Sequence, residues 1–128
     1  MPAPEHFEQI GTRGFYRPVG VMTFEQAVEQ IAVAIEYARS MRLADLLVNA
    51  LGLSGFSAPS TFGRYALAVR WVEAGGGVLR VAIVVRPELI DREKIGMVMV
   101  KNRGMDADVF SDEADAIKWL DSRSARRL

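Results

Sequence analysis

The sequence predicts an α/β fold, with a mostly parallel sheet of four or five strands, an N-terminal hairpin and flanking helices. Two short extended segments, at 6–10 and 14–22, come first, and apolar strand-like runs then alternate with amphipathic helical runs. Such alternation is typical of a parallel sheet joined by right-handed helical crossovers. The chain of 128 residues, half of them apolar, suits a single domain whose core spans about 6–121.

Turn and cap residues mark the first elements. A Gly-Thr-Arg-Gly stretch at 11–14 connects the two extended segments and has the length of a hairpin connection. Thr23 and Gln26 have the spacing of a capping box, so we expect a helix to begin here. Apolar residues then recur at three- and four-residue intervals until about Arg42, which predicts one buried stripe. The stripe comprises Phe24, Ala27, Val28, Ile31, Ile35 and Ala38.

The middle of the chain predicts a strand, a loop and a second helix. A contiguous apolar run favours a buried strand at 44–51, and the Gly/Ser-rich segment 52–60 favours a loop. Ser57 or Ser60 is the expected N-cap of the helix, and the three glycines at 75–77 are its expected end. We expect this helix to bury the apolar face formed by Phe62, Tyr65, Ala66, Val69 and Val72.

The last third of the chain continues the alternation. An almost unbroken apolar run at 78–85 predicts a strand inside the sheet, covered on both faces. The next strand-like segment, 107–110, needs a crossover before it, so we interpret 91–102 as a helix with Asp91 as N-cap. The acids of Ser-Asp-Glu at 111–113 favour the positive end of a helix dipole and predict the start of a last helix.

Composition excludes several classes of function. The chain has no cysteine, which rules out disulfides and thiolate chemistry, and its single histidine is His6. Its 16 basic residues balance 16 acidic residues, which argues against a nucleic-acid partner. The 18 uncharged residues at 46–63 include Gly, Ser, Asn and Pro, so we expect no membrane span. The N-terminus lacks the pattern of a secretory signal, and we expect a soluble, cytoplasmic protein.

No motif in the sequence predicts an enzyme. The phosphate-binding glycine motifs and G-x-S-x-G are absent, and the glycines at 75–77 follow a helix instead of preceding one. No histidine accompanies the acids between 106 and 115, so we interpret them as strand ends and a helix start. We therefore expect no catalytic residue, no metal site and no cofactor.

A hydroxyl-rich loop at 54–61 is the first candidate site. It follows the end of a strand and precedes a helix, which is where open α/β folds place their ligands. Ser57, Ser60 and Thr61, with Arg64 one turn into the helix, are the candidate modification or partner site. The alternative is that one serine caps the helix and the other hydroxyls only solvate the loop.

A methionine-rich segment is the second candidate site. In the helix expected at 91–102, four consecutive residues from Met97 to Val100 are apolar and point in nearly every direction. Such a helix is deeply buried, contacts a second copy of the chain, or lines an apolar ligand site. Met97, Met99 and Met105 are the candidate apolar interface or ligand residues.

Three stretches of the sequence resemble a known family. They are Arg-Pro-Glu-Leu-Ile-Asp at 86–91, Asn-Arg-Gly at 102–104, and the strand-and-helix segment 109–120. Together they resemble the SpoIIAA-like family of the STAS superfamily, which is named for anti-sigma-factor antagonists, over about residues 15–121. The resemblance implies the same mostly parallel fold.

The resemblance also implies a function. In anti-sigma-factor antagonists a partner kinase phosphorylates a serine at the start of the second helix, after an aspartate. The corresponding region here is 57–61, where no aspartate precedes a hydroxyl residue. We expect a non-enzymatic regulatory or protein-interaction domain with a protein partner, and possible contact between two copies in a homodimer. The alternative that the resemblance implies is a small carrier of lipid or another apolar ligand, because the family it resembles is linked by fold to CRAL-TRIO lipid-transfer domains.

Overall fold

A computed structural model describes residues 2–125 of the chain and confirms the α/β class. The main sheet has five strands in the order β1-β2-β4-β6-β7. The first pair is an antiparallel hairpin, and each later pair is parallel. The strands are β1 (Phe7–Ile10), β2 (Arg13–Tyr16), β4 (Asp45–Asn49), β6 (Arg80–Val84) and β7 (Ala107–Phe110).

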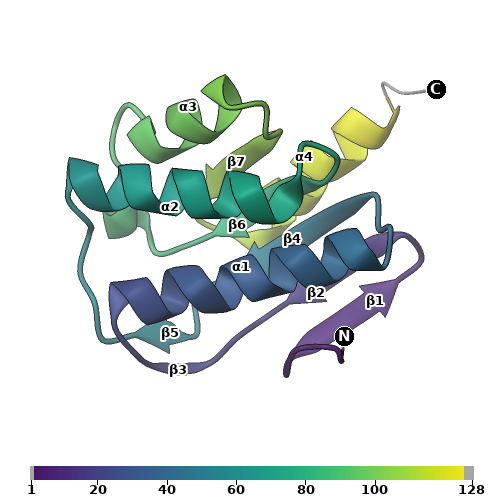
Figure 1. Ribbon diagram of the computed structural model, residues 1–128, viewed down its shortest axis with the longest axis horizontal. Coiled ribbons are helices and arrows are strands. Elements are labelled where there is room, and N and C mark those ends of the chain that lie inside the picture. Colours follow the sequence, from purple (N-terminus) through teal and green to yellow (C-terminus); the bar gives the residue numbers. More distant parts are fainter. Residues whose placement is uncertain (1, 126–128) are drawn as a thin grey trace.

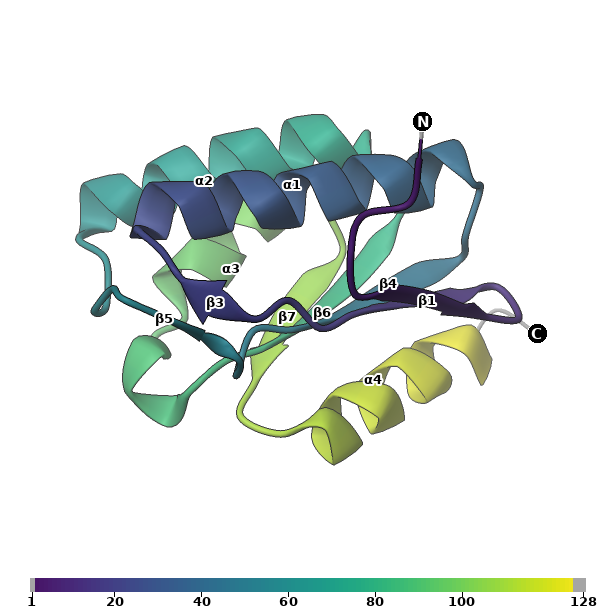
Figure 2. The ribbon, with the colours of Figure 1, turned by 90° about the horizontal axis from the view of Figure 1, so that it is seen from below.

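Helices cover both faces of this sheet. The helices α1 (Phe24–Ser40), α2 (Thr61–Gly75) and α3 (Ile95–Asn102) lie on one face, and α4 (Glu113–Ala125) lies on the other (Figure 2). In the view of Figure 1, α1 and α2 lie side by side across the sheet. None of the described helices is both long enough and apolar enough to cross a membrane.

The expected caps of the first two long helices are confirmed. Thr23 accepts a hydrogen bond from the Gln26 backbone N–H, and the Gln26 side chain accepts one from the Thr23 N–H, which completes the capping box. Ser60, not Ser57, caps α2 by accepting a hydrogen bond from the Gly63 N–H. Gly76 ends α2 in the left-handed conformation, where a glycine costs least.

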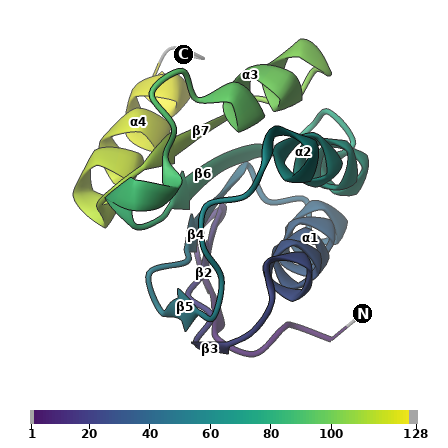
Figure 3. The same cartoon turned by 90° about the vertical axis from the view of Figure 1, so that its left-hand side faces the viewer.

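Several boundaries differ from the expected ones. The segment expected as one strand at 14–22 is divided, because Pro18 has no N–H to donate to a ladder. Its second part, β3 (Gly20–Val21), instead pairs in parallel with β5 (Leu53–Ser54), which lies in the segment expected to be a loop (Figure 3). A 3-10 turn, η1 (Pro87–Leu89), follows β6.

Helix α3 begins four residues later than expected. Lys94 precedes it with a φ of 50°, and this left-handed residue prevents a continuous helix from Asp91. Asp91 still satisfies the helix start, since its carboxylate accepts a hydrogen bond from the Ile95 N–H at 3.1 Å. The predicted capping residue is therefore used, but from a turn outside the helix.

The expected buried face of α2 is wrong. Phe62 is 79% exposed, and Tyr65, Ala66 and Val69 are also exposed. The helix carries two apolar stripes, and the buried one combines a single large ring with three residues that have little or no side chain, which allows α1 and α2 to approach closely. The buried residues of α2 are Ala68, Trp71, Ala74 and Gly75.

Alternate residues of the central strands enter two cores. On the face of α1, α2 and α3, Leu46, Val48 and Ile83 join the larger cluster of buried side chains. On the opposite face, a smaller cluster packs the strands against α4. The contiguous apolar runs predicted for these strands are thus explained by burial on both faces. The smaller cluster comprises Phe15, Leu47, Ala82, Val84, Ala116 and Leu120.

An ionic contact holds the start of α4 against the sheet. Arg17 donates two hydrogen bonds of 2.9 Å to the Glu113 carboxylate, and the Asn49 amide donates one of 2.6 Å. The hydrogen bonds from Arg17 and then from Asn49 lower the pKa of Glu113 from 4.5 to about 2, against the opposing effect of burial. The stabilisation is present above about pH 4.5 and is lost as the pH falls through about 2.

We predict that Glu113→Gln lowers the free energy of unfolding by about 1 kcal/mol at neutral pH, because a partly exposed ion pair is screened by water. Between pH 4.5 and 2 the variant should lose less stability than the original chain, since it has no carboxylate to protonate. Urea titrations at several pH values measure both effects. Glu93→Gln, an equal charge change at an exposed loop residue, is the control. Equal pH profiles for all three proteins would contradict the prediction.

Candidate functional site

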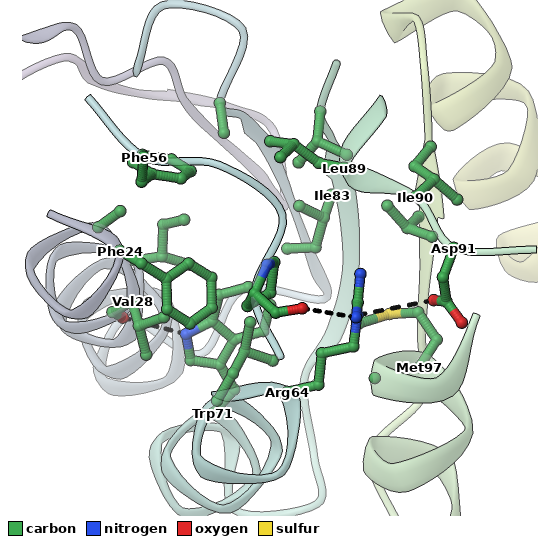
Figure 4. A pocket seen from close by; sticks show the side chains of 18 of the residues that line it. Phe24, Val28, Phe56, Arg64, Trp71, Ile83, Leu89, Ile90, Asp91 and Met97 are labelled. Carbon is green, nitrogen blue, oxygen red and sulfur yellow. Dashed lines mark hydrogen bonds and ion pairs between the residues drawn. The ribbon is translucent and has the colours of Figure 1, made fainter. Parts of the chain in front are cut away.

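An apolar pocket opens where the carboxyl ends of the central strands meet the amino-terminal halves of α1 and α2 (Figure 4). Its volume is about 110 Å³. Open parallel sheets place their ligands at this edge, so the pocket lies where the sequence predicts a site. The loop before α2 and the segment between β6 and α3 complete its walls.

Side chains from four different segments form the apolar wall. Phe24 comes from α1, Ile83 from β6 and Met97 from α3, while Phe56 comes from the loop that precedes α2. The rings of Phe24 and Phe56 meet edge to face, with their centroids 6.0 Å apart. The pocket therefore depends on the tertiary fold, since no single segment contains enough of its wall.

Gly55 places Phe56 at the pocket. Its φ is 101°, a conformation that glycine adopts with little strain. A Cβ at this position would lie 2.7 Å from the carbonyl oxygen of Met22 and 2.9 Å from its nitrogen. The loop thus passes so close to the backbone before α1 that only a glycine fits there.

Trp71 fixes the relative position of α1 and α2 beside the pocket. Its indole is 4% exposed, and its N–H donates a hydrogen bond of 3.0 Å to the carbonyl oxygen of Val28 (Figure 4). This hydrogen bond satisfies the one polar group of the ring, so the rest of the indole can form part of the apolar wall.

Arg64 brings a positive charge to the mouth of the pocket. Its Nη1 donates a hydrogen bond of 2.7 Å to the Pro59 carbonyl, and its Nε lies 3.7 Å from Asp91 Oδ1 (Figure 4). The side chain is 15% exposed, so much of its length lies within the protein. Lys94 also lines the pocket, but its ammonium forms an ion pair of 3.1 Å with Asp108.

The structure separates the hydroxyl residues from Arg64. Ser57, Ser60 and Thr61 are exposed, and none of the three lines the pocket. Ser60 is occupied as the cap of α2. Of the four residues predicted for the modification or partner site, only Arg64 faces the pocket. Phosphorylation at one of the three hydroxyls stays a prediction.

The methionine cluster is also divided. Met97 lines the pocket, whereas Met105 is buried and packs against Gly75, away from it. Met99 is half-buried, packs against the main core and does not line the pocket. Val98 is the exposed apolar residue of α3. The expected apolar surplus on α3 is therefore largely buried, and the larger exposed apolar stripe lies on α2.

The acids near the last strand make structural contacts. Asp108 pairs with Lys94, Asp112 accepts a hydrogen bond from the Asp115 N–H, and Glu113 binds Arg17. Within residues 2–125, no three histidine, aspartate or glutamate side chains are grouped closely enough to hold a metal ion. These three acids therefore have partners within the protein.

Several pocket residues were not singled out from the sequence. Phe56 is an aromatic residue in a Gly/Ser-rich loop, which is a signal that it packs against something. Trp71 lies off the apolar stripe that we assigned to α2, so the choice of the wrong helix face concealed it. Leu89 and Ile90 gave no periodic signal, because they belong to a turn and its exit.

Comparison with known proteins adds no family to this description. The chain matches no protein-family model and no curated protein. What can be said of its kind rests on the structure: it is an α/β protein with a five-stranded, mostly parallel sheet and an apolar pocket at the carboxyl edge of that sheet.

Proposed function

We propose that this protein binds a small apolar molecule in the pocket between α1, α2 and α3. The observation that carries the proposal is an apolar cavity, built from several segments, at the edge where parallel sheets place ligands. Its few polar groups, chiefly Arg64 and Asp91, lie at the mouth. This arrangement favours the alternative of a small carrier of an apolar ligand.

The pocket volume limits the size of the buried part of the ligand. An engineered cavity of about 150 Å³ lined by aliphatic and aromatic side chains binds benzene. The present volume of about 110 Å³ is comparable, so it suits one ring or a short chain of carbon atoms. A longer molecule would extend through the mouth past Arg64.

We predict that 1-hexanol binds the pocket and that Gly96→Leu weakens its binding at least tenfold. Gly96 lines the pocket, and a Cβ there would make only ordinary contacts, the nearest at 3.8 Å from the Cβ of Arg64. The leucine should therefore be tolerated while it fills the mouth. Tryptophan fluorescence measures binding in a Trp119→Phe background, which leaves Trp71 as the only tryptophan.

Val98→Leu is the matched control. Val98 lies on the same helix, is 49% exposed and does not line the pocket, so 1-hexanol should bind this variant as it binds the parent. Failure of 1-hexanol to alter Trp71 fluorescence at millimolar concentration would oppose the proposal, and so would equal binding by the Gly96→Leu variant.

A second candidate function is that of a STAS-like protein-interaction domain, and the exposed stripe on α2 favours it. Phe62, Tyr65, Ala66 and Val69 recur on one face of the helix and are exposed. We propose that the partner on this face is a second copy of the chain, because the surface along the stripe can complement itself in charge.

The self-complementarity follows from an antiparallel pairing of two α2 helices about a two-fold axis at Val69. Tyr65, with Arg103 stacked over its ring at 5.0 Å, would lie opposite Glu73 of the other copy. Phe62 would lie opposite Gly76, beside which the guanidinium of Arg39 lies.

We predict that the protein sediments as a dimer at tens of micromolar. Glu73→Arg should return it to a 14.2 kDa monomer, because like charges would then face each other across the axis. Adding Arg103→Glu to that variant should restore the dimer. A parent protein that sediments only at 14.2 kDa, or a double variant that stays monomeric, would contradict this pairing.

A further inference from the structure

We infer that the natural ligand of the pocket is a carboxylic acid, whose carboxylate binds the guanidinium of Arg64 while its short apolar part enters the cavity. The inference rests on the proposed function and names the chemical class of the ligand. It comes from the position of Arg64, whose guanidinium lies beside an otherwise largely apolar cavity and keeps N–H groups that no close acceptor occupies.

Arg64 has hydrogen-bonding capacity left for a ligand. A guanidinium carries five N–H donors, and the hydrogen bond that the structure gives this one is from Nη1 to the Pro59 carbonyl. The contact of Nε with Asp91, at 3.7 Å, is too long for a hydrogen bond. A carboxylate could therefore bind two N–H groups at once, which is the geometry that a guanidinium favours.

Asp91 does not occupy the position on Arg64 where the carboxylate of a ligand would bind. Its two carboxylate oxygens lie 3.1 and 3.2 Å from the Ile95 nitrogen, and they satisfy the start of α3. Moving Asp91 to bind Arg64 more closely would leave that N–H without its partner. The loose ion pair thus keeps Arg64 near the mouth, and it leaves N–H groups of the guanidinium available to the carboxylate of a ligand.

Lys94, the second cation at the mouth, does not add to the charge available for a doubly charged ligand. Lys94 directs its ammonium to Asp108, at 3.1 Å, and Phe110, whose ring centroid is 5.8 Å away. Asp91 adds a negative charge to the rim. One guanidinium beside one carboxylate suits a singly charged planar group better than a phosphate.

Two probes of nearly equal size test the inference at neutral pH. Hexanoate carries the carboxylate, and 1-hexanol has the same number of carbon atoms without a charge. Each is titrated against the full chain with Trp119→Phe, and against the Arg64→Gln and Arg64→Lys variants of it, with Trp71 fluorescence as the readout. Gln keeps hydrogen-bonding groups without the charge. Lys keeps the charge without the paired N–H donors of a guanidinium.

The original site should bind hexanoate at least tenfold more tightly than 1-hexanol. Arg64→Gln should remove that preference and leave the affinity for 1-hexanol within about twofold, whereas Arg64→Lys should keep part of the preference. Unchanged binding of 1-hexanol shows that the pocket is intact in the variant.

Other outcomes would overturn the inference in distinguishable ways. If 1-hexanol binds at least as well as hexanoate, the ligand class is wrong but the proposed function stands. If Arg64→Gln weakens both probes equally, Arg64 supports the structure and does not select the ligand. If neither probe binds the original site, both the proposed function and the ligand class fail.

Discussion

The hydrogen bond from Trp71 to the Val28 carbonyl is the contact on which the pocket depends. A buried indole N–H without a partner would be costly, so the ring has one favourable position between α1 and α2. That position places a large flat surface against the cavity. Phe24 and Phe56, which meet edge to face, form another part of the wall. The pocket is thus bounded by side chains whose own packing fixes them.

The buried charged groups of the sheet lie at its amino edge, opposite the pocket. Asp45, at the amino end of β4, is 2% exposed and accepts hydrogen bonds from Arg13 and Arg80, the first residues of the two neighbouring strands. Removing one partner of such a network leaves a buried charge, which costs several kcal/mol, so the three strand starts are held together. At the carboxyl edge, Arg64 and Asp91 stay at the mouth of the pocket.

Local signals explain why much of the fold could be predicted from the sequence. The capping box at Thr23, the glycines after α2 and the contiguous apolar strands each depend on near neighbours in the chain. The parallel order followed from the spacing between strands. The buried face of α2 could not be predicted in this way, because both of its stripes are apolar and only the packing of α1 decides between them.

The loop predicted as a candidate site borders the pocket, but most of the residues singled out in and after that loop do not line it. The strand-to-helix loop does border the pocket, yet the hydroxyl residues of that loop are exposed, and Phe56 and Pro59 face the cavity. Hydroxyl residues can be recognised in a sequence as candidate site residues. The residues of an apolar site are of the same types as those of a hydrophobic core, so the sequence does not distinguish them. Distinguishing a lined cavity from a filled core requires the volume between side chains, which a sequence does not contain.

An NMR measurement tests the central claim, that the pocket admits a ligand, most directly. Protein labelled with ¹³C at the methyl groups of isoleucine, valine and methionine is mixed with unlabelled 1-hexanol, and intermolecular NOEs are recorded. We expect NOEs from the probe to Val28, Ile83 and Met97, three lining residues on three different elements. NOEs confined to exposed methyls such as those of Val69, or no NOEs at all, would contradict the account.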